Sequence, residues 1–291
     1  MHEVHWPIII AIYLFLAGVG VAAFYTGILS NLFGNWKYRK LAKYGSYIGV
    51  PLIIIGVLLL LADLGRPFYF WHFLLTFKLS STMSIGVWLL SAFVIFGGLN
   101  MLTWLAEEDF AQNNSLLGAF KGKEGLRSLT GYLGIILGIL TAAYTGVLLA
   151  STSAALWSST QYLGLLFLVS ATSTGMAALM LVLAWRKEDI GIIHKLAKAD
   201  MIVVLFEIIV LALMFSALSA SAPAAASVVL GGSYAIWFWV GIIGCGLVLP
   251  VIIDLAASKK AFGAPMLASI LVLVGGFLLR YVMLYAGQVG L

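Results

Sequence analysis

The amino-acid sequence predicts an all-α fold, a polytopic membrane protein with eight transmembrane helices, and three observations lead to this prediction. The 291 residues are 63% hydrophobic and 9% charged, whereas soluble domains are about 45–50% apolar and about 25% charged. The mean hydropathy is +1.11. Eight runs of mainly apolar residues approach or exceed the length of about 20 residues that a helix rising ~1.5 Å per residue needs to cross the hydrocarbon core.

The first four helices are predicted from apolar runs with clear borders. The run at 7–31 follows an N-terminus without the basic segment of a signal peptide, so we expect it to be retained as a spanning helix. The second run, 46–62, ends immediately before an acidic residue, and the third is 82–105. The fourth, 129–150, follows the longest gap in the chain, 106–128, which we interpret as a loop.

The last four helices are predicted over 160–185, 200–219, 234–255 and 265–286. The connections before the fifth and the seventh are uncharged and rich in Ser, Ala and Gly, as expected of tight turns. No run remains for a soluble catalytic domain, so residues 1–291 are expected to form one integral membrane domain. Short links pair the helices, which favours two packed four-helix bundles.

Basic residues are distributed unevenly between the two ends of these helices. Thirteen of the sixteen Lys and Arg residues follow odd-numbered helices, and the exceptions are Arg66, Lys78 and Arg280. Because basic loops stay in the cytoplasm, both termini are expected on the outer, periplasmic side of the cell inner (cytoplasmic) membrane. Topology and contact with membrane lipid therefore account for the net charge of +5, and no nucleic-acid partner is expected.

Several polar residues are predicted to share one depth in the outer half of the membrane. The predicted topology gives the direction of each helix, so the position of a residue along its helix gives its depth in the membrane. The group consists of Tyr13, Asp63, Arg66, His72, Tyr144, Thr145 and Arg280. Membranes tolerate ionisable groups mainly where they face protein, a wet cavity or headgroups, so this outer cluster is the predicted functional site. The tyrosines also fit an interfacial aromatic belt.

Arg280 lies several residues inside the last helix, where insertion scales assign an arginine a cost of roughly 2.5–3.5 kcal/mol. Asp63 is the only acid at a matching depth, so we expect an ion-pair network of Asp63 with Arg280 and Arg66. Such a network could simply link the second and eighth helices, which is a structural role. This role is compatible with a function in the same site. His72 fits two roles equally well, capping its loop or donating to a ligand.

Glu207 stands apart, near the middle of the sixth helix. A carboxyl at the centre of a membrane predicts a functional group such as a proton carrier. Asp200 and Asp254 lie in the same inner half, which suggests proton movement toward the outer site. A protonated Glu207 that is hydrogen-bonded to the polar residues at 170–174 is the structural alternative.

Composition limits the cofactors that this chain can bind. Cys245 is its one cysteine, which excludes an iron–sulfur cluster, a zinc site or an internal disulfide built by this chain alone. Membrane cytochromes b hold haem between histidines paired within helices, and the sequence has no such pairs. We therefore expect no haem, no iron–sulfur cluster and no bound metal.

Five motifs occur in order along nearly the whole chain. They are Tyr-Leu-Phe-Leu-Ala-Gly at 13–18, Asp-Leu-Gly-Arg-Pro at 63–67, Met-Ser-Ile-Gly-Val-Trp at 83–88, Tyr-Thr-Gly-Val at 144–147, and a segment at 275–288 with Gly-Gly, Leu-Arg-Tyr and Ala-Gly-Gln. Their order, their positions on helices and the chain length together resemble the NrfD/PsrC family of polysulfide reductase-type membrane subunits.

The resemblance implies two four-helix bundles that bind a quinone, menaquinone or ubiquinone, near the outer face. It also implies a ferredoxin-like [4Fe-4S] partner subunit on that side and, in many such complexes, a molybdopterin catalytic subunit. Tyr144 falls where the family uses a tyrosine to hydrogen-bond a quinone carbonyl. Tyr13 falls where some members carry histidine; a tyrosine still donates a hydrogen bond but is no proton shuttle near neutral pH.

Quinone chemistry independently requires an apolar cleft, donors for two carbonyls and a titratable group in contact with water. The predicted catalytic residues are His72, Asp63 and Glu207, and the predicted cofactor-binding residues are Tyr144, Tyr13, Arg66, Arg280 and Thr145. Two other functions remain open. A transporter coupled through Glu207 would be expected to show inverted halves and broken helices, and a purely structural anchor would do no quinone chemistry.

Overall fold

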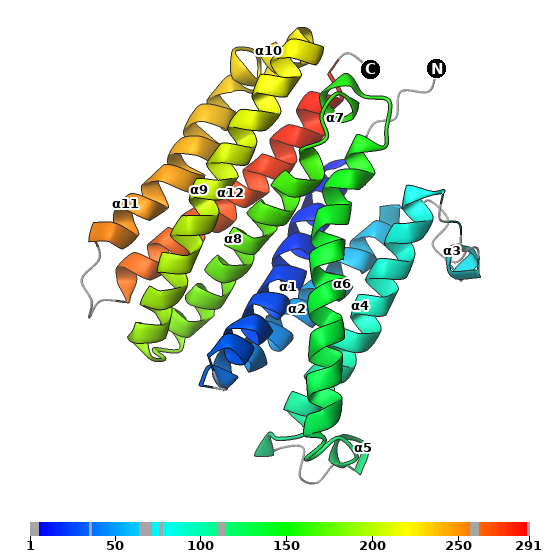
Figure 1. Cartoon of the computed structure of the whole chain (residues 1–291), viewed down its shortest axis with the longest axis vertical. Coiled ribbons are helices and arrows are strands. Elements are labelled where there is room, and N and C mark those ends of the chain that lie inside the picture. Colours follow the sequence, from blue (N-terminus) through cyan, green and yellow to red (C-terminus); the bar gives the residue numbers. More distant parts are fainter. Residues whose placement is uncertain are drawn as a thin grey trace.

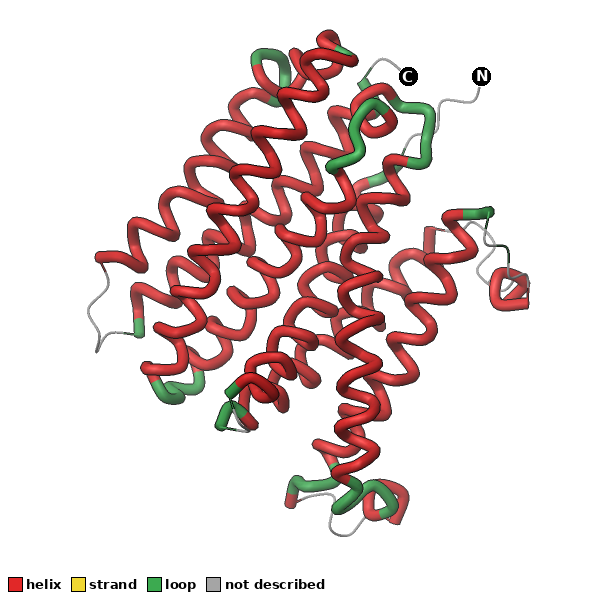
Figure 2. Tube along the Cα trace, viewed as in Figure 1, coloured by secondary structure: helices red, strands yellow, loops and turns green. Residues whose placement is uncertain are grey.

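A computed structural model of the chain describes residues 6–34, 37–63, 71–75, 78, 80–109, 115–256 and 262–289. These residues are almost entirely helical, and no strand occurs among them (Figure 2). Within this described part, eight helices are long and apolar enough to cross a membrane. The predicted all-α membrane fold is therefore confirmed.

The first bundle contains the first four spans. They are α1 (Ile8–Phe33), α2 (Arg39–Asp63), α4 (Thr82–Leu105) and α6 (Glu124–Ala150). Helix α1 packs against α2 and α6, and α4 packs against α6 and α2, which closes the group (Figure 1). Two short helices, α3 (Trp71–Leu75) and α5 (Ser115–Gly118), lie in the connections of this bundle.

The second bundle contains the last four spans. They are α8 (Leu163–Trp185), α9 (Ile190–Ser221), the π-helical segment η3 (Trp237–Val248) that continues as α11 (Leu249–Ala256), and α12 (Gly263–Gly287). Helix α8 packs against α9 and α12, and η3 packs against α12. The short helix α7 (Ala155–Ser158) lies between α6 and α8, and the short helix α10 (Pro223–Leu230) lies between α9 and η3.

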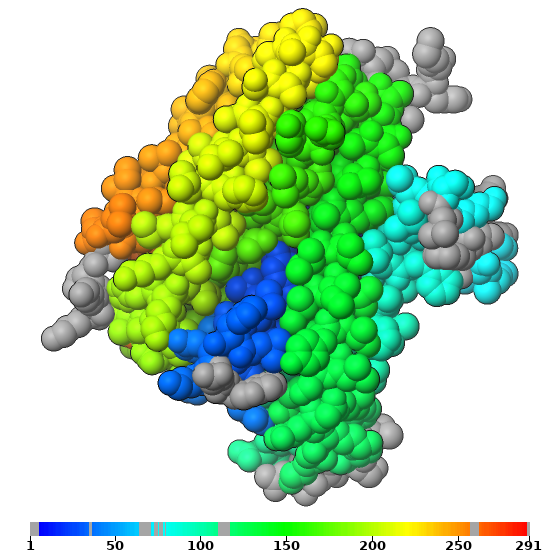
Figure 3. Space-filling view, in the orientation of Figure 1, coloured from blue at the N-terminus to red at the C-terminus, as the bar shows by residue number. Residues whose placement is uncertain are grey.

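The bundles meet where α8 packs against α1 and α6. Small residues allow this contact, since a Cβ built on Gly175 of α8 would lie 2.5 Å from the Cβ of Ala22 in α1. Such close approach of backbones is how helices associate where lipid supplies no hydrophobic contrast. Most of α1 and α8 is consequently buried, and α6, α8 and α9 cover much of α1 in the space-filling view (Figure 3).

Three helices begin earlier than hydropathy predicts. Helix α2 begins at Arg39 instead of 46, α6 at Glu124 instead of 129, and α9 at Ile190 instead of 200. The additional turns carry charged side chains, which an apolar run does not include. Ion pairs such as Lys40 to Glu188 at 2.5 Å hold those of α2 and α6, and in α9 Lys195 donates to the hydroxyl of Tyr38 at 2.9 Å. Apolarity marks the part of a helix inside lipid, whereas the helix itself continues into the polar layer.

Helix α1 begins and helix α12 ends at the same face of the molecule, which we call the terminal face (Figure 1). The backbone N–H of Trp6 donates to Oε1 of Gln288 at 2.8 Å, and Nε2 of Gln288 donates to the carbonyl of Trp6 at 3.3 Å. We call the opposite end, which carries Arg39 and Arg127, the basic face. Which face is periplasmic stays a prediction.

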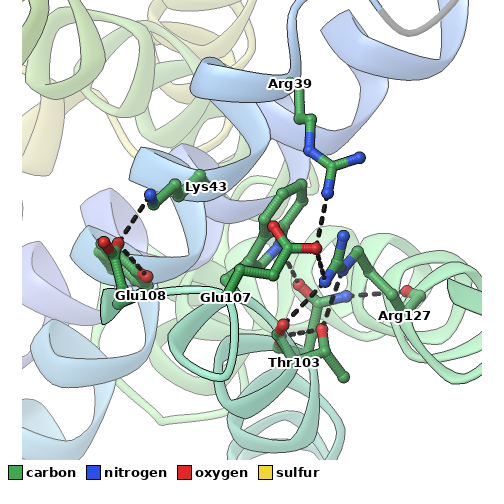
Figure 4. Close-up of polar contacts among 9 residues, drawn as sticks. Arg39, Lys43, Thr103, Glu107, Glu108 and Arg127 are labelled. Carbon is green, nitrogen blue, oxygen red and sulfur yellow. Dashed lines mark hydrogen bonds and ion pairs between the residues drawn. The ribbon is translucent and has the colours of Figure 1, made fainter. Parts of the chain in front are cut away.

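On the basic face, Glu107 joins three helices of the first bundle (Figure 4). Its carboxylate accepts from Nη2 of Arg39 and from Nη2 of Arg127, both at 2.6 Å. Arg127 also donates to the carbonyl of Thr103 at 2.7 Å, and its guanidinium lies 4.1 Å from the ring centroid of Trp104. Partial burial would raise the pKa of Glu107, but the two arginines outweigh it, and the pKa lies below its ordinary value.

Candidate functional site

A cavity of about 600 Å³ lies between α1, α2, α4 and α6 at the terminal face. It extends from Trp6, Asp63 and Met83 near that face to Ile95, halfway along α4. Its lining is mainly apolar, and its volume lies in the range of small-molecule sites. Ile95 is 58% exposed, so this end of the cavity opens toward the lipid-facing surface. The polar residues in the lining are Tyr13, Asp63, Ser91, Tyr144, Ser151 and Thr152.

Two phenols face this cavity from different helices. Tyr13 comes from α1 and is 1% exposed, and Tyr144 comes from α6 and is 7% exposed. The two side chains are close enough to interact electrostatically. Among the described residues, neither hydroxyl has a hydrogen-bond partner. Neither hydroxyl oxygen is among the described atoms that are fully enclosed without a partner, so both O–H groups reach the cavity and can donate to a ligand or a bound water there.

Asp63, the last residue of α2, is exposed and lines the mouth of the cavity. The structure therefore brings together Tyr13, Tyr144 and Asp63, three of the predicted site residues. A carboxyl in this position can exchange protons with water at the terminal face.

The other predicted residues near the mouth are placed differently. His72 lies on the exposed helix α3, where its ring stacks on Trp71 with centroids 3.7 Å apart, and it is not among the described residues that line the cavity. Arg66 lies outside the described residues. Thr145 donates to the carbonyl of Ala142 at 2.7 Å and does not line the described cavity, because the next residue on a helix is rotated by about 100°.

The expected ion pair between Asp63 and Arg280 is wrong for the described residues. Arg280 is fully buried in the second bundle, where Nη1 donates to the carbonyl of Gly276 at 2.7 Å and to Oγ of Ser170 at 3.2 Å. The ring of Phe167 lies 5.5 Å from the guanidinium. Arg280 is thus neither a partner of Asp63 nor part of the cavity lining.

Helix α1 separates Arg280 from the cavity. Gly18 of α1 faces Arg280, since a Cβ built on Gly18 would lie 2.9 Å from Nη2 of the arginine. Tyr13 is five residues earlier on the same helix, which corresponds to a rotation of about 140° at 3.6 residues per turn. Depth along a helix predicts the height of a residue but leaves its direction open, and this accounts for the misplacement.

Glu207 belongs to the same buried group as Arg280. It is 3% exposed, lies within hydrogen-bonding reach of Ser170 and interacts electrostatically with Arg280. Ser173 and Thr174 lie beside it around a void of about 10 Å³. Of the polar residues expected near Glu207, Thr172 points elsewhere and pairs with the hydroxyl of Tyr25 at 2.5 Å. We call Arg280, Glu207 and Ser170 the buried charge cluster.

Trp6, Gly86 and Ser91 are among the residues of the cavity to which sequence reasoning gave no role. The position of Ser91 could have been found from the sequence, because Val87, Ser91 and Ile95 are spaced by four residues and therefore share one helix face. Gly86 lies within a motif that the sequence singled out, but the motif does not reveal what faces it. Among the described residues, no group of three or more His, Cys, Asp or Glu side chains could hold a metal.

Comparisons with known proteins identify the family of this fold and cavity. The family model described as "Polysulphide reductase, NrfD" matches residues 1–291. The chain belongs to the NrfD family. This confirms the resemblance predicted from the motifs, and it agrees with a multi-pass membrane protein.

Individual NrfD relatives extend along nearly the full chain. A polysulfide reductase chain of Wolinella succinogenes is 33% identical over 98% of this chain and 94% of its own length. Protein NrfD of Escherichia coli is 28% identical over 97% of this chain and 94% of its own length. A selenate reductase subunit of Mesobacillus selenatarsenatis matches a shorter part, 26% identical over 37% of this chain and 25% of its own length.

Proposed function

We propose that this chain is the membrane subunit of a respiratory reductase complex in the cell inner membrane, where it exchanges electrons between a membrane quinone and an iron–sulfur partner. Relatives named as parts of a polysulfide reductase and of a selenate reductase support assembly with further chains. The observation that carries the quinone proposal is the apolar cavity with its two unbonded phenols, Tyr13 and Tyr144.

Each part of the cavity has a task in this chemistry. Reduction of a quinone to a quinol takes up two electrons and two protons, and oxidation releases them. The phenol O–H groups of Tyr13 and Tyr144 donate to the ring carbonyl oxygens and fix the ring, while the apolar walls exclude water from it. Asp63 at the mouth moves protons between the site and the aqueous phase.

The electrons have to come from another chain. A [4Fe-4S] cluster takes four thiolate ligands, and this chain has one cysteine. We propose that a ferredoxin-like subunit docks on the terminal face, next to the cavity mouth, and passes electrons to or from a molybdopterin catalytic subunit. This arrangement keeps the electron path short, because the quinone ring and the cluster-bearing partner then lie at the same face.

The test is Tyr144→Phe, which removes the donor and keeps the ring. Loss of one hydrogen bond of about 1–1.5 kcal/mol lowers the quinol-linked turnover of the purified complex about tenfold, with unchanged co-purification of the partner subunits. Tyr132→Phe is the matched control, since Tyr132 lies on the same helix but is 51% exposed. Unchanged turnover of Tyr144→Phe would remove this residue from the mechanism. An active complex from which no quinone can be extracted would favour a structural anchor.

Proton movement through the second bundle is a second candidate function, and the burial of Glu207 beside Arg280 and Ser170 favours it. Asp200, which is 4% exposed on the same helix, provides a further buried carboxyl toward the basic face. In liposomes that contain the complex, Glu207→Gln is expected to abolish proton movement while quinol-linked electron transfer persists. Proton movement and turnover equal to those of the wild type would exclude this route.

A further inference from the structure

The position of Tyr144 in the cavity depends on a contact with α4. Gly86 on α4 faces the ring directly, and a Cβ built on Gly86 would overlap the Cζ, the Cε1 and the hydroxyl oxygen of Tyr144. The phenol therefore occupies the space that a side chain at position 86 would fill. Both residues line the cavity, so this contact lies within the ligand site itself.

Steric fit, rather than bonding, holds the Tyr144 phenol. Among the described residues its hydroxyl has no hydrogen-bond partner that could fix the ring direction. The ring is 7% exposed, and the α4 backbone at Gly86 forms the surface against which it rests. A phenol held in this way keeps its O–H available for a ligand and still has a defined direction.

Gly86 differs from the glycines that bring helix backbones together. At Gly146 of α6, the atoms nearest to an added Cβ belong to the backbone of Leu163 and Gly164, the ordinary sign of helix packing. At Gly86, the three nearest atoms all belong to the side chain of Tyr144. A substitution at position 86 consequently acts on the Tyr144 ring first.

We infer that Gly86 is a positioning residue that sets the direction of the Tyr144 hydroxyl and thereby determines how tightly the cavity holds a carbonyl-bearing ring. This inference rests on the quinone function proposed above. Any side chain at position 86 turns the phenol away from its present direction. A hydrogen bond weakens steeply once distance and angle depart from their optimum, so the bound ring loses its donor although Tyr144 is still present.

The experiment compares Gly86→Ala with Gly98→Ala in the complete complex. Gly98 lies on the same helix, and a Cβ there would meet nothing within 4 Å, so its replacement controls for the helix propensity of alanine. Gly86→Ala is expected to raise the KM for a soluble quinol analogue about tenfold, with a smaller change in kcat, and to weaken binding of a quinone-site probe equally. Gly98→Ala is expected to match the wild type.

The second arm of the experiment tests Gly86→Ala in a complex that already carries Tyr144→Ala. Without the ring, an added methyl at position 86 displaces nothing, so Gly86→Ala is expected to cause no further loss of kcat/KM in the Tyr144→Ala background. A full, independent loss there would overturn the inference. If Gly86→Ala alone does not assemble, assembly of the double variant supports the steric link, and failure of both variants overturns it.

The outcomes separate this inference from the proposed function. A wild-type complex that binds no quinone probe contradicts the quinone function. A Tyr144→Phe variant with normal turnover removes Tyr144 from the mechanism and overturns the positioning role with it. A complex in which Tyr144→Phe is impaired and Gly86→Ala is normal keeps that function and overturns the positioning role alone.

Discussion

At the residue scale, the buried charge cluster places an arginine and a carboxyl inside the protein at membrane depth. Arg280 and Glu207 come from α12 and α9, and both are at most 3% exposed. Taking either charge out of water is costly, and each offsets part of the cost of the other. The ring of Phe167 and the Ser170 hydroxyl supply further favourable contacts to the guanidinium.

This pairing predicts non-additive effects on stability. Arg280→Met removes the cation with which the Glu207 carboxyl interacts, so it is expected to lower the stability of the second bundle. The double variant Arg280→Met with Glu207→Gln is expected to recover part of that loss, as measured by the unfolding temperature in detergent. The control is Arg186→Met, at an exposed arginine. Strictly additive effects of Arg280→Met and Glu207→Gln would show that the two residues are not coupled.

Residue types and depth were sufficient to predict part of the cavity lining. Tyr13, Tyr144 and Asp63 line one cavity, as expected from their common level. Arg280 shares that level but faces the opposite side of α1. The direction of a side chain depends on how each helix is rotated against its neighbours, and this information lies in packing contacts such as Gly86 against Tyr144, which no single motif contains.

At the element scale, ion pairs join the helices of the first bundle at the basic face, and the part of the chain that the structure describes has fewer such links at the terminal face. Glu107 follows α4 and accepts from Arg39 of α2 and Arg127 of α6. Asn100 adds a second link, donating to the carbonyl of Arg127 at 2.8 Å and accepting from Ser46 at 2.9 Å. Among the described residues, the polar links between these helices thus concentrate at the end away from the cavity.

The Glu107 link predicts a pH dependence of stability. Its folded-state pKa lies below the unfolded value of about 4.3, because the hydrogen bonds from Arg39 and Arg127 outweigh the effect of partial burial. The stabilisation is therefore fully present above that unfolded value and is lost as the pH falls through the folded pKa. Unfolding temperatures at neutral and acid pH should show a smaller acid-induced decrease in Glu107→Gln than in the exposed control Glu124→Gln. An equal decrease in both variants would contradict this role.

The sequence was also sufficient to predict all eight spans, because an apolar run of about 20 residues has few alternatives. It was insufficient to predict where α2, α6 and α9 begin, since their first turns lie in the polar layer and depend on distant residues. Ion pairs hold the first turns of α2 and α6, and a hydrogen bond from Lys195 to Tyr38 holds α9. The short helices also left no readable pattern in the sequence, since helices of a few residues depend on their surroundings. The sequence likewise gave no sign that η3 is π-helical.

At the scale of the whole molecule, the two bundles hold different chemistry. The cavity is lined by helices of the first bundle, together with the segment around Trp6, and the buried charge cluster lies in the second. Helix α1 is the wall between them, with Tyr13 on one side and Gly18 on the other. The proposed electron exchange would therefore take place in the first bundle, and the proposed proton movement in the second.

The second bundle nevertheless contributes to the cavity through the chain ends. Gln288 at the end of α12 holds the backbone of Trp6 by two hydrogen bonds, and Trp6 forms part of the cavity wall. The Trp6 ring also lies 5.8 Å from the ring of Trp157, whose Nε1 donates to the carbonyl of Met283 at 2.7 Å. A shift of α12 would therefore also move Trp6 at the mouth of the cavity.

The exposure of Ile95, halfway along α4, has a consequence for how affinity is expressed. A ligand that enters sideways at this depth is drawn from the bilayer, so its effective concentration is its mole fraction among lipids and not its amount per volume of water. Dissociation constants measured in micelles then scale with the amount of detergent, because added detergent dilutes the ligand in the phase from which it enters. Two preparations of the same complex agree only when affinity is expressed per molecule of lipid or detergent.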